Sequence, residues 1–195
     1  IQSAENLRKL DDDALLKLIE PHARGTLADL GRKRPDIFTD TFNELEVQRL
    51  CELLLNWLNL EKQRALPFRV LRTEEKQKVE LAGLSLQLQA DRVDQLEDGR
   101  LVIIDYKTGE NADAKGWLDP RPTELQVPLY CIEAEQAPAA ALIARIHARS
   151  TVFKGNAQES NIAPGIDAFE GNEEIADWLQ LLDHWRNALT QLATE

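Results

Sequence analysis

The sequence predicts an α/β protein in which a mixed β-sheet is flanked by helices. Two observations predict this class. The first third of the chain carries apolar residues at helical spacing, and from Pro67 onward the apolar spacing shortens to two residues, as in strands. A helical segment, a strand and a closing helix then follow in turn. This order indicates one sheet with helices packed against it.

The chain has 195 residues, 43% of them hydrophobic, which is enough for one domain with its own core. We expect a helical part at residues 1–66 and a sheet core with flanking helices at residues 67–195. Because the chain contains no methionine, we expect it to be a fragment of a longer protein. It shows neither a secretory signal nor a run of ~20 apolar residues that could span a membrane, so we expect a cytoplasmic protein.

Two helices are predicted in the first part of the chain. The first runs from Asp11 to Ala28, with a break or kink at Pro21, and a loop follows at residues 31–36. The second runs from about Thr41 to Arg64 and begins with a capping box, in which Glu44 follows Thr41 by three residues. The second helix has a broad apolar stripe that we expect to be buried: Phe42, Leu45, Leu50, Leu53, Leu54, Trp57, Leu58 and Leu60.

The period of two begins with short strands at residues 68–71 and 79–81. A third strand runs from Leu84 to about Val93, and Asp98–Gly99 signals a hairpin turn. The apolar run at residues 101–104 reads as a central strand that is buried on both faces.

The last third of the chain begins with a polar loop that holds Trp117. A helix at residues 123–134, a strand at residues 139–149 and a closing helix at residues 172–193 then follow, with a Gly/Asn/Ser-rich stretch before the last helix. Trp57, Trp178 and Trp185 lie in apolar helical stripes and are expected in the core.

Charge and cysteine content exclude some kinds of site. The two cysteines, Cys51 and Cys131, lie in apolar patterns and are expected as buried thiols. Two thiols cannot ligate an iron–sulfur cluster or form a Cys-only zinc site. The formal charge of -11 argues against a broadly basic surface for nucleic acid, but it leaves room for a local basic groove.

Asp105 and Lys107 stand at the end of the predicted central strand. Residues i and i+2 share a face of a strand, so these two side chains point together and Tyr106 points the other way. Antiparallel pairing with the preceding strand can bring Asp91 beside Asp105. Two neighbouring carboxylates suit Mg²⁺ or Mn²⁺, and the Lys107 ammonium would orient an attacking water. The alternative is a set of surface charges that decorate a strand end.

Three sequence blocks together resemble a known family. They are Gln89–Asp94, with its Asp-Arg-x-Asp pattern, Leu101–Gly109, with Asp-Tyr-Lys, and a Gln-x-x-x-Tyr pattern at Gln126 and Tyr130. In this order they resemble the RecB-like and AddB-like nuclease domains of the PD-(D/E)XK superfamily, which are C-terminal modules of bacterial DNA repair proteins.

The resemblance implies a restriction-endonuclease-like fold and a Mg²⁺- or Mn²⁺-dependent deoxyribonuclease that acts with a helicase on DNA. Asp91 and Asp105 would bind the metal, and Asp94 would be structural or support the ligands. The Tyr106 carbonyl is a further candidate ligand, and Lys107 would assist catalysis. An alternative is a non-catalytic DNA-end-binding or scaffolding domain of a helicase–nuclease complex.

Other residues are candidates for supporting roles. The family places a further site residue on a helix upstream of the sheet, and Glu46 is the in-chain candidate for it. Gln126 and Tyr130 suit the site and helix packing equally well. Two further assignments remain open: Trp117 either stacks on a base or anchors its loop, and a basic row either contacts phosphate or protects an edge strand, namely Arg145, His147 and Arg149.

Overall fold

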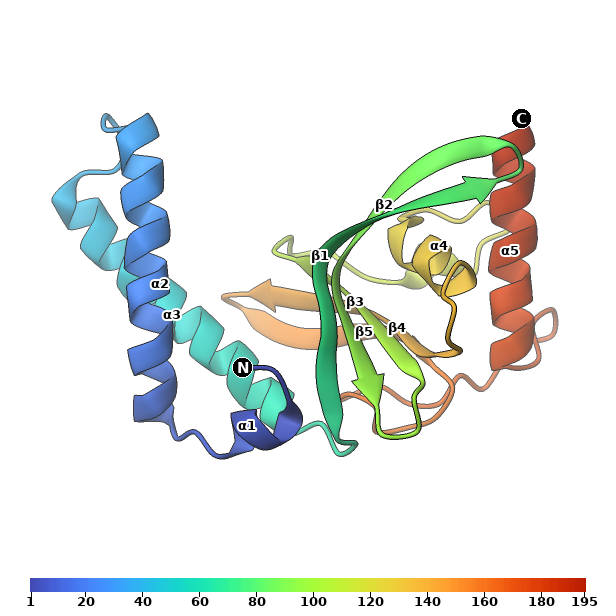
Figure 1. Ribbon diagram of the computed structural model, residues 1–195, viewed down its shortest axis with the longest axis horizontal. Coiled ribbons are helices and arrows are strands. Elements are labelled where there is room, and N and C mark those ends of the chain that lie inside the picture. The colour runs from blue at the N-terminus through green and yellow to red at the C-terminus, as the bar shows by residue number, and fades with distance from the viewer.

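The computed structural model describes residues 1–195 and contains one five-stranded mixed sheet (Figure 1). The strands follow each other across the sheet in chain order, and all neighbours are antiparallel except β3 and β4. This confirms the predicted mixed sheet. Their bounds are β1 (Phe68–Leu81), β2 (Leu84–Leu96), β3 (Leu101–Lys107), β4 (Pro138–His147) and β5 (Ser150–Ala157).

Helices flank this sheet on both sides (Figure 1). The helical hairpin formed by the second and third helices extends away from the sheet and touches it at one end, while the last two helices lie on the other side. No helix is both long and apolar enough to cross a membrane. The helices are α1 (Ala4–Arg8), α2 (Asp12–Lys33), α3 (Asp40–Lys62), α4 (Gln126–Ile132) and α5 (Trp178–Thr194), with a 3₁₀ turn at Lys115–Trp117.

β3 lies between two apolar cores, as the continuous apolar run predicts. Leu101 and Ile103 face the core that holds α4, α5 and Trp185. Val102 and Ile104 face the second core, where the end of α3 contributes Trp57. Trp178 is buried in the first core, so all three helical tryptophans are core residues as expected. Cys51 and Cys131 are buried free thiols, which confirms the prediction for both.

The helical hairpin differs from the prediction in two places. α2 continues through Pro21 to Lys33, so it is longer than predicted and includes part of the expected loop. α3 begins earlier than predicted, because the Thr39 hydroxyl accepts the Phe42 amide at 3.4 Å and caps the helix. The capping box of Thr41 and Glu44 is therefore wrong.

The outer end of the α3 stripe is exposed rather than buried. Leu45 is 62% exposed and Phe42 is 38% exposed. This half of α3 packs against α2 and the loop between the two helices, since the hairpin stands away from the sheet there (Figure 1). At this end of α3, neighbouring elements therefore cover only part of the apolar stripe.

The strands also differ from the prediction in two places. The two short strands predicted before Leu84 are one continuous strand, β1, because the polar residues between them pair in register with β2, for example Gln77 with Leu88. β5 lies in the Gly/Asn/Ser-rich stretch and was not predicted. Its only large apolar side chains are Val152 and Phe153, too few to show a period.

Candidate active site

The site is built where β2 and β3 separate. The two strands pair in register up to Arg92 and Ile104, which places the next residues, Asp91 and Asp105, side by side. At this point the Asp91 carboxylate accepts the Tyr106 backbone N–H, with Oδ2 at 2.7 Å from the nitrogen. A side chain of β2 therefore binds the backbone of β3 just beyond the last strand pair.

Asp105 and Lys107 form an ion pair on the face of β3 that carries α4. The Lys107 Nζ atom lies 2.9 Å from Asp105 Oδ2. Asp105 is 4% exposed. Burial raises the pKa of Asp105; Lys107 lowers it in part, and the charges of Asp91 and Glu124 raise it further. The hydrogen bond from Lys107 to Asp105 raises the pKa of Lys107, so this side chain is an ammonium at neutral pH.

Glu124 belongs to the candidate site but was not predicted from the sequence. Its Oε2 atom lies 4.0 Å from the Lys107 Nζ atom, so a second carboxylate lies near the lysine. Glu124 has a positive φ of 56°, which is uncommon for a residue other than glycine and turns the chain just before α4. Only its proximity to Gln126 in the sequence could have pointed to it, because nothing in a sequence pattern predicts that backbone conformation.

A cavity of about 160 Å³ opens beside this lysine. Its lining includes Lys107, Glu124 and Ile143 together with the loop after β3. Trp117 forms one wall but is only 1% exposed, and its indole N–H donates to the Glu124 carbonyl at 3.2 Å. Of the two alternatives for Trp117, the structure favours the loop anchor, because a ring this deeply buried cannot stack on a base.

The carboxylates present fit a hard divalent cation with an incomplete protein shell. No group of three or more His, Cys, Asp or Glu side chains converges to hold a metal. Mg²⁺ is commonly held by one or two carboxylates, several waters and a substrate phosphate. The buried Asp105 next to Asp91 provides such a pair, and a cation would offset the cost of burying Asp105 and the repulsion from Asp91, which Lys107 offsets only in part.

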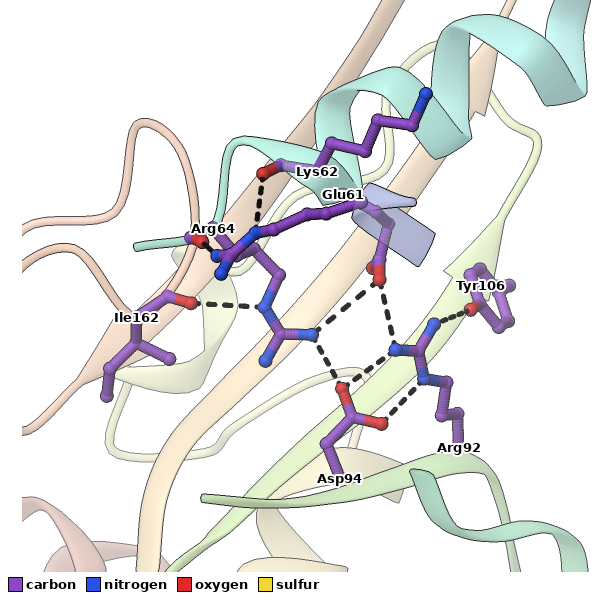
Figure 2. A network of polar contacts seen from close by, with 8 residues as sticks. Glu61, Lys62, Arg64, Arg92, Asp94, Tyr106 and Ile162 are labelled. Atoms are coloured by element: carbon purple, nitrogen blue, oxygen red, sulfur yellow. Dashed lines mark hydrogen bonds and ion pairs between the residues drawn. The ribbon is translucent and has the colours of Figure 1, made fainter. Parts of the chain in front are cut away.

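The opposite face of the same strands carries a buried network of four charges (Figure 2). Arg92 forms a two-pronged contact with Asp94, at 2.7 and 2.9 Å, and also reaches Glu61 at 3.0 Å. Arg64 Nη1 donates to Asp94 Oδ2 at 2.6 Å, the same oxygen that accepts from Arg92 Nη2. Asp94 is fully buried, which agrees with the structural role implied for it. Two guanidinium groups and two carboxylates thus neutralise each other and join the end of α3 to β2.

Tyr106 connects this network to the pair of candidate metal ligands. Its hydroxyl accepts a hydrogen bond from Arg92 Nη1 at 3.0 Å, and its ring packs edge-on against Trp57 at 5.6 Å between centroids. Its backbone N–H meanwhile donates to Asp91 on the other face. One residue therefore contacts both the charge network and a candidate metal ligand.

Gln126 and Tyr130 lie on α4 and bind strand backbone. The Gln126 amide donates to the Gln89 carbonyl at 2.6 Å, two residues before Asp91. The Tyr130 hydroxyl donates to the Glu75 carbonyl of β1 at 3.0 Å. Gln126 thus fixes β2 close to Asp91, while Tyr130 fixes the neighbouring strand.

Glu46 is not brought to the site. It lies on α3 and pairs with Arg49 one turn away. α3 reaches the sheet only through its other end, where Glu61 contacts Arg92. Glu61 was not predicted, although its spacing of four from Trp57 puts both side chains on one helix face.

The basic row of Arg145, His147 and Arg149 does not lie on an edge strand, which was one of its two interpretations. β4 lies between β3 and β5, so it is not an edge strand. Arg149 follows the strand and pairs with Glu110, whereas Arg145 lies opposite Lys107 in register. Arg145 is therefore the member of this row that is next to the candidate site.

A comparison with protein-family models identifies the superfamily of the chain. The model of the PD-(D/E)XK nuclease superfamily matches residues 2–195, so the chain belongs to this superfamily. The fold is accordingly the restriction-endonuclease-like α/β fold that the sequence blocks implied. No curated protein matches the chain significantly.

Proposed function

We propose that this nuclease domain hydrolyses phosphodiester bonds of DNA with Mg²⁺ or Mn²⁺ held by Asp91 and Asp105. The observation that carries the proposal is the arrangement on one face of β3. There the Lys107 ammonium lies 2.9 Å from the buried Asp105, and Asp91 is held beside Asp105 by the Tyr106 amide.

Each residue of this group has a role in the proposal. Asp91 and Asp105 would hold the cation, and the Tyr106 carbonyl is a further candidate ligand. When bound, the ion supplies Lewis-acid activation of the attacking water and neutralises the charge that develops on the phosphate. Lys107 donates hydrogen bonds from a fixed position and so orients the water and stabilises a phosphate oxygen.

The position of Lys107 suits the stabilisation of negative charge rather than proton removal. Its hydrogen bond to Asp105 raises its pKa, so it holds its proton at neutral pH. Glu124 provides a second carboxylate at 4.0 Å from the lysine. The lysine is thus positioned by two acids and keeps its charge for the phosphate.

A role in DNA repair or recombination, with a helicase domain or subunit as partner, is part of the same proposal. It is supported by the resemblance of the three sequence blocks to RecB-like and AddB-like domains.

The test is metal-dependent cleavage of linear and single-stranded DNA by the wild-type chain and by Asp105→Ala and Lys107→Ala. We expect cleavage with Mn²⁺ or Mg²⁺, no cleavage with a chelator, and loss of cleavage in both variants. Asp13→Ala, which removes an exposed carboxylate from the first turn of α2, is the matched control and should cleave normally.

Two outcomes contradict the proposal. Robust cleavage by either site variant would remove the assignment of these residues. If the wild-type chain binds DNA ends but cuts nothing with either metal, the domain has a binding or scaffolding role instead.

A further inference from the structure

Lys154 on the unpredicted strand β5 is aligned with the candidate ligand Asp105. In the sheet register Asp105 pairs with Ile143, and Ile143 pairs with Lys154. Directly paired residues point to the same face of a sheet, so Lys154 and Asp105 emerge on the same side. Two strand spacings separate their backbones, about 10 Å.

The next row of the sheet places a second cation beside Lys107. Arg145 pairs with Lys107 in register and is two residues from Ile143, so it shares their face. Its guanidinium donates to the Glu110 carbonyl at 2.9 Å and to the Ser150 hydroxyl at 3.0 Å. These neutral acceptors hold the side chain in place without cancelling its charge.

Arg145 and Lys154 line one hollow of about 420 Å³. Lys115 also lines it, and the only acidic side chain there is Asp113, which lies 3.8 Å from the Lys115 ammonium. Lys154 is exposed and forms no ion pair. The hollow therefore carries a net positive charge in a chain whose formal charge is -11.

The hollow is next to the active-site cavity. Asp113 lines both, and the Ile143 side chain of the cavity wall lies in the row between Asp105 and Lys154. A bound strand that places one phosphate at Asp105 can therefore run across Ile143 into the basic hollow. The ~10 Å separates the Asp105 and Lys154 backbones within one row of the sheet, so the two positions would contact different phosphates of the bound strand.

We propose that Lys154, Arg145 and Lys115 form a phosphate-binding surface that holds the DNA backbone beside the phosphate to be cleaved. This rests on the proposed nuclease function and adds to it where the strand lies. Contacts to phosphate carry no sequence information, so the surface orients DNA without selecting a sequence. It also accounts for how an acidic chain can bind a polyanion.

The competing explanation for Lys154 is protection of the sheet edge. β5 is an edge strand, and lysines on edge strands oppose pairing with another chain. Under that explanation, loss of Lys154 changes self-association and leaves DNA affinity unchanged. The two explanations therefore predict different measurements on the same variant.

The experiment measures binding of a short fluorescein-labelled oligothymidylate by anisotropy, in chelator, across a series of salt concentrations. We expect Lys154→Ala to weaken binding several-fold and to reduce the slope of log K against log salt by about 0.7, the value for one phosphate contact on a single strand. Lys154→Glu should weaken it further. Lys17→Ala removes an exposed, unpaired lysine from α2 and should bind as wild type.

A neutral methylphosphonate placed at each position of the oligonucleotide in turn locates the contact. At one position the substitution should weaken binding to the wild-type chain but not to Lys154→Ala, because the variant has already lost that interaction. Sedimentation of both lysine variants at the same concentrations reports self-association.

Unchanged affinity and salt slope in both Lys154 variants would overturn the surface, as would a methylphosphonate effect of equal size in the variant and the wild-type chain. These measurements need no catalysis. A chain that binds in this way but does not cleave would contradict the proposed nuclease function and support the binding surface. Normal cleavage together with unchanged DNA binding in both Lys154 variants would support the nuclease function and overturn the binding surface.

Discussion

The Asp91 carboxylate accepts the backbone N–H of Tyr106, with 2.7 Å between Oδ2 and the nitrogen. The strand that carries Asp105 thereby fixes the position of Asp91, which belongs to another strand. Asp91 Oδ1 makes no hydrogen bond within the chain and is the atom left for a cation. The two candidate ligands are thus held together by a bond that uses only half of one carboxylate.

This relationship predicts different stabilities for two variants of Asp91. Asp91→Asn keeps an oxygen that can accept the Tyr106 amide, while Asp91→Ala leaves that amide without a partner, at a cost of about 1–3 kcal/mol. Both variants should lose DNA cleavage by roughly 10²–10³-fold, because both lose the charge proposed to hold the cation. Chemical denaturation and a cleavage assay measure the two effects separately. Equal stability of the two variants would show that the Asp91–Tyr106 bond contributes nothing.

The raised pKa of Asp105 predicts that this acid destabilises the metal-free domain. Burial raises its folded-state pKa above the ordinary value of about 3.9, so the unfolded chain gives up the proton first as pH rises. The free energy of unfolding therefore falls between these two pKa values and stays lower at neutral pH. We expect Asp105→Asn, which cannot ionise, to be more stable than wild type in chelator, by a margin that grows as pH rises from 4 to 7. Urea unfolding at each pH measures this margin.

Addition of metal should reverse that order. A cation present at a hundred times its Kd for the folded wild type adds about 2.7 kcal/mol to the free energy of unfolding of the wild type. Asp105→Asn lacks the ligand and should gain far less. If Mn²⁺ stabilises both proteins equally, the ion binds somewhere other than at Asp105.

The central part of the fold and the core of the site were predictable because each depends on local sequence. The apolar run of β3 fixes which residues face the two cores, and strand alternation places Asp105 and Lys107 together. The Asp98–Gly99 turn sets the register that brings Asp91 alongside them, with Gly99 at a φ of 90°. Short-range geometry is sufficient for each of these steps.

The features that were missed depend on contacts distant in sequence. Arg64 donates hydrogen bonds to Asp94, thirty residues away, and to the Ile162 carbonyl, ninety-eight residues away. The periodicity of a sequence does not predict such partners. β5 lacks an apolar pattern because it is an edge strand with one neighbour. Glu46 and the outer part of the α3 stripe were misjudged for one reason. The sequence shows that a helix is amphipathic, but not which end of it meets the sheet.

Gln126 and Tyr130 should differ in their effect on catalysis. Each donates one hydrogen bond to a strand carbonyl, so Gln126→Ala and Tyr130→Phe should each cost about 1 kcal/mol of stability. Gln126 binds β2 two residues before Asp91, whereas Tyr130 binds β1. We therefore expect slower cleavage from Gln126→Ala and wild-type cleavage from Tyr130→Phe, measured at saturating Mn²⁺. Slower cleavage by Tyr130→Phe would instead give its hydroxyl a role at the site.

The four-charge network predicts a large loss of stability when one charge is removed. Glu61 is 2% exposed and faces both arginines, so Glu61→Gln leaves two buried guanidinium groups with Asp94 alone. Breaking a buried ion pair in this way costs about 3–5 kcal/mol, far more than the loss of a surface pair. Glu52→Gln, an exposed position on the same helix, should change stability by less than about 0.5 kcal/mol.

Arg92→Lys tests the same network from the β2 side. A lysine keeps the charge but cannot reproduce the two-pronged contact with Asp94 while also reaching Glu61 and Tyr106. We expect a loss of stability comparable to that of Glu61→Gln. The double variant should lose less than the sum of the two, because each change removes the same Glu61–Arg92 contact. Strict additivity in urea unfolding would mean that Glu61 and Arg92 act independently.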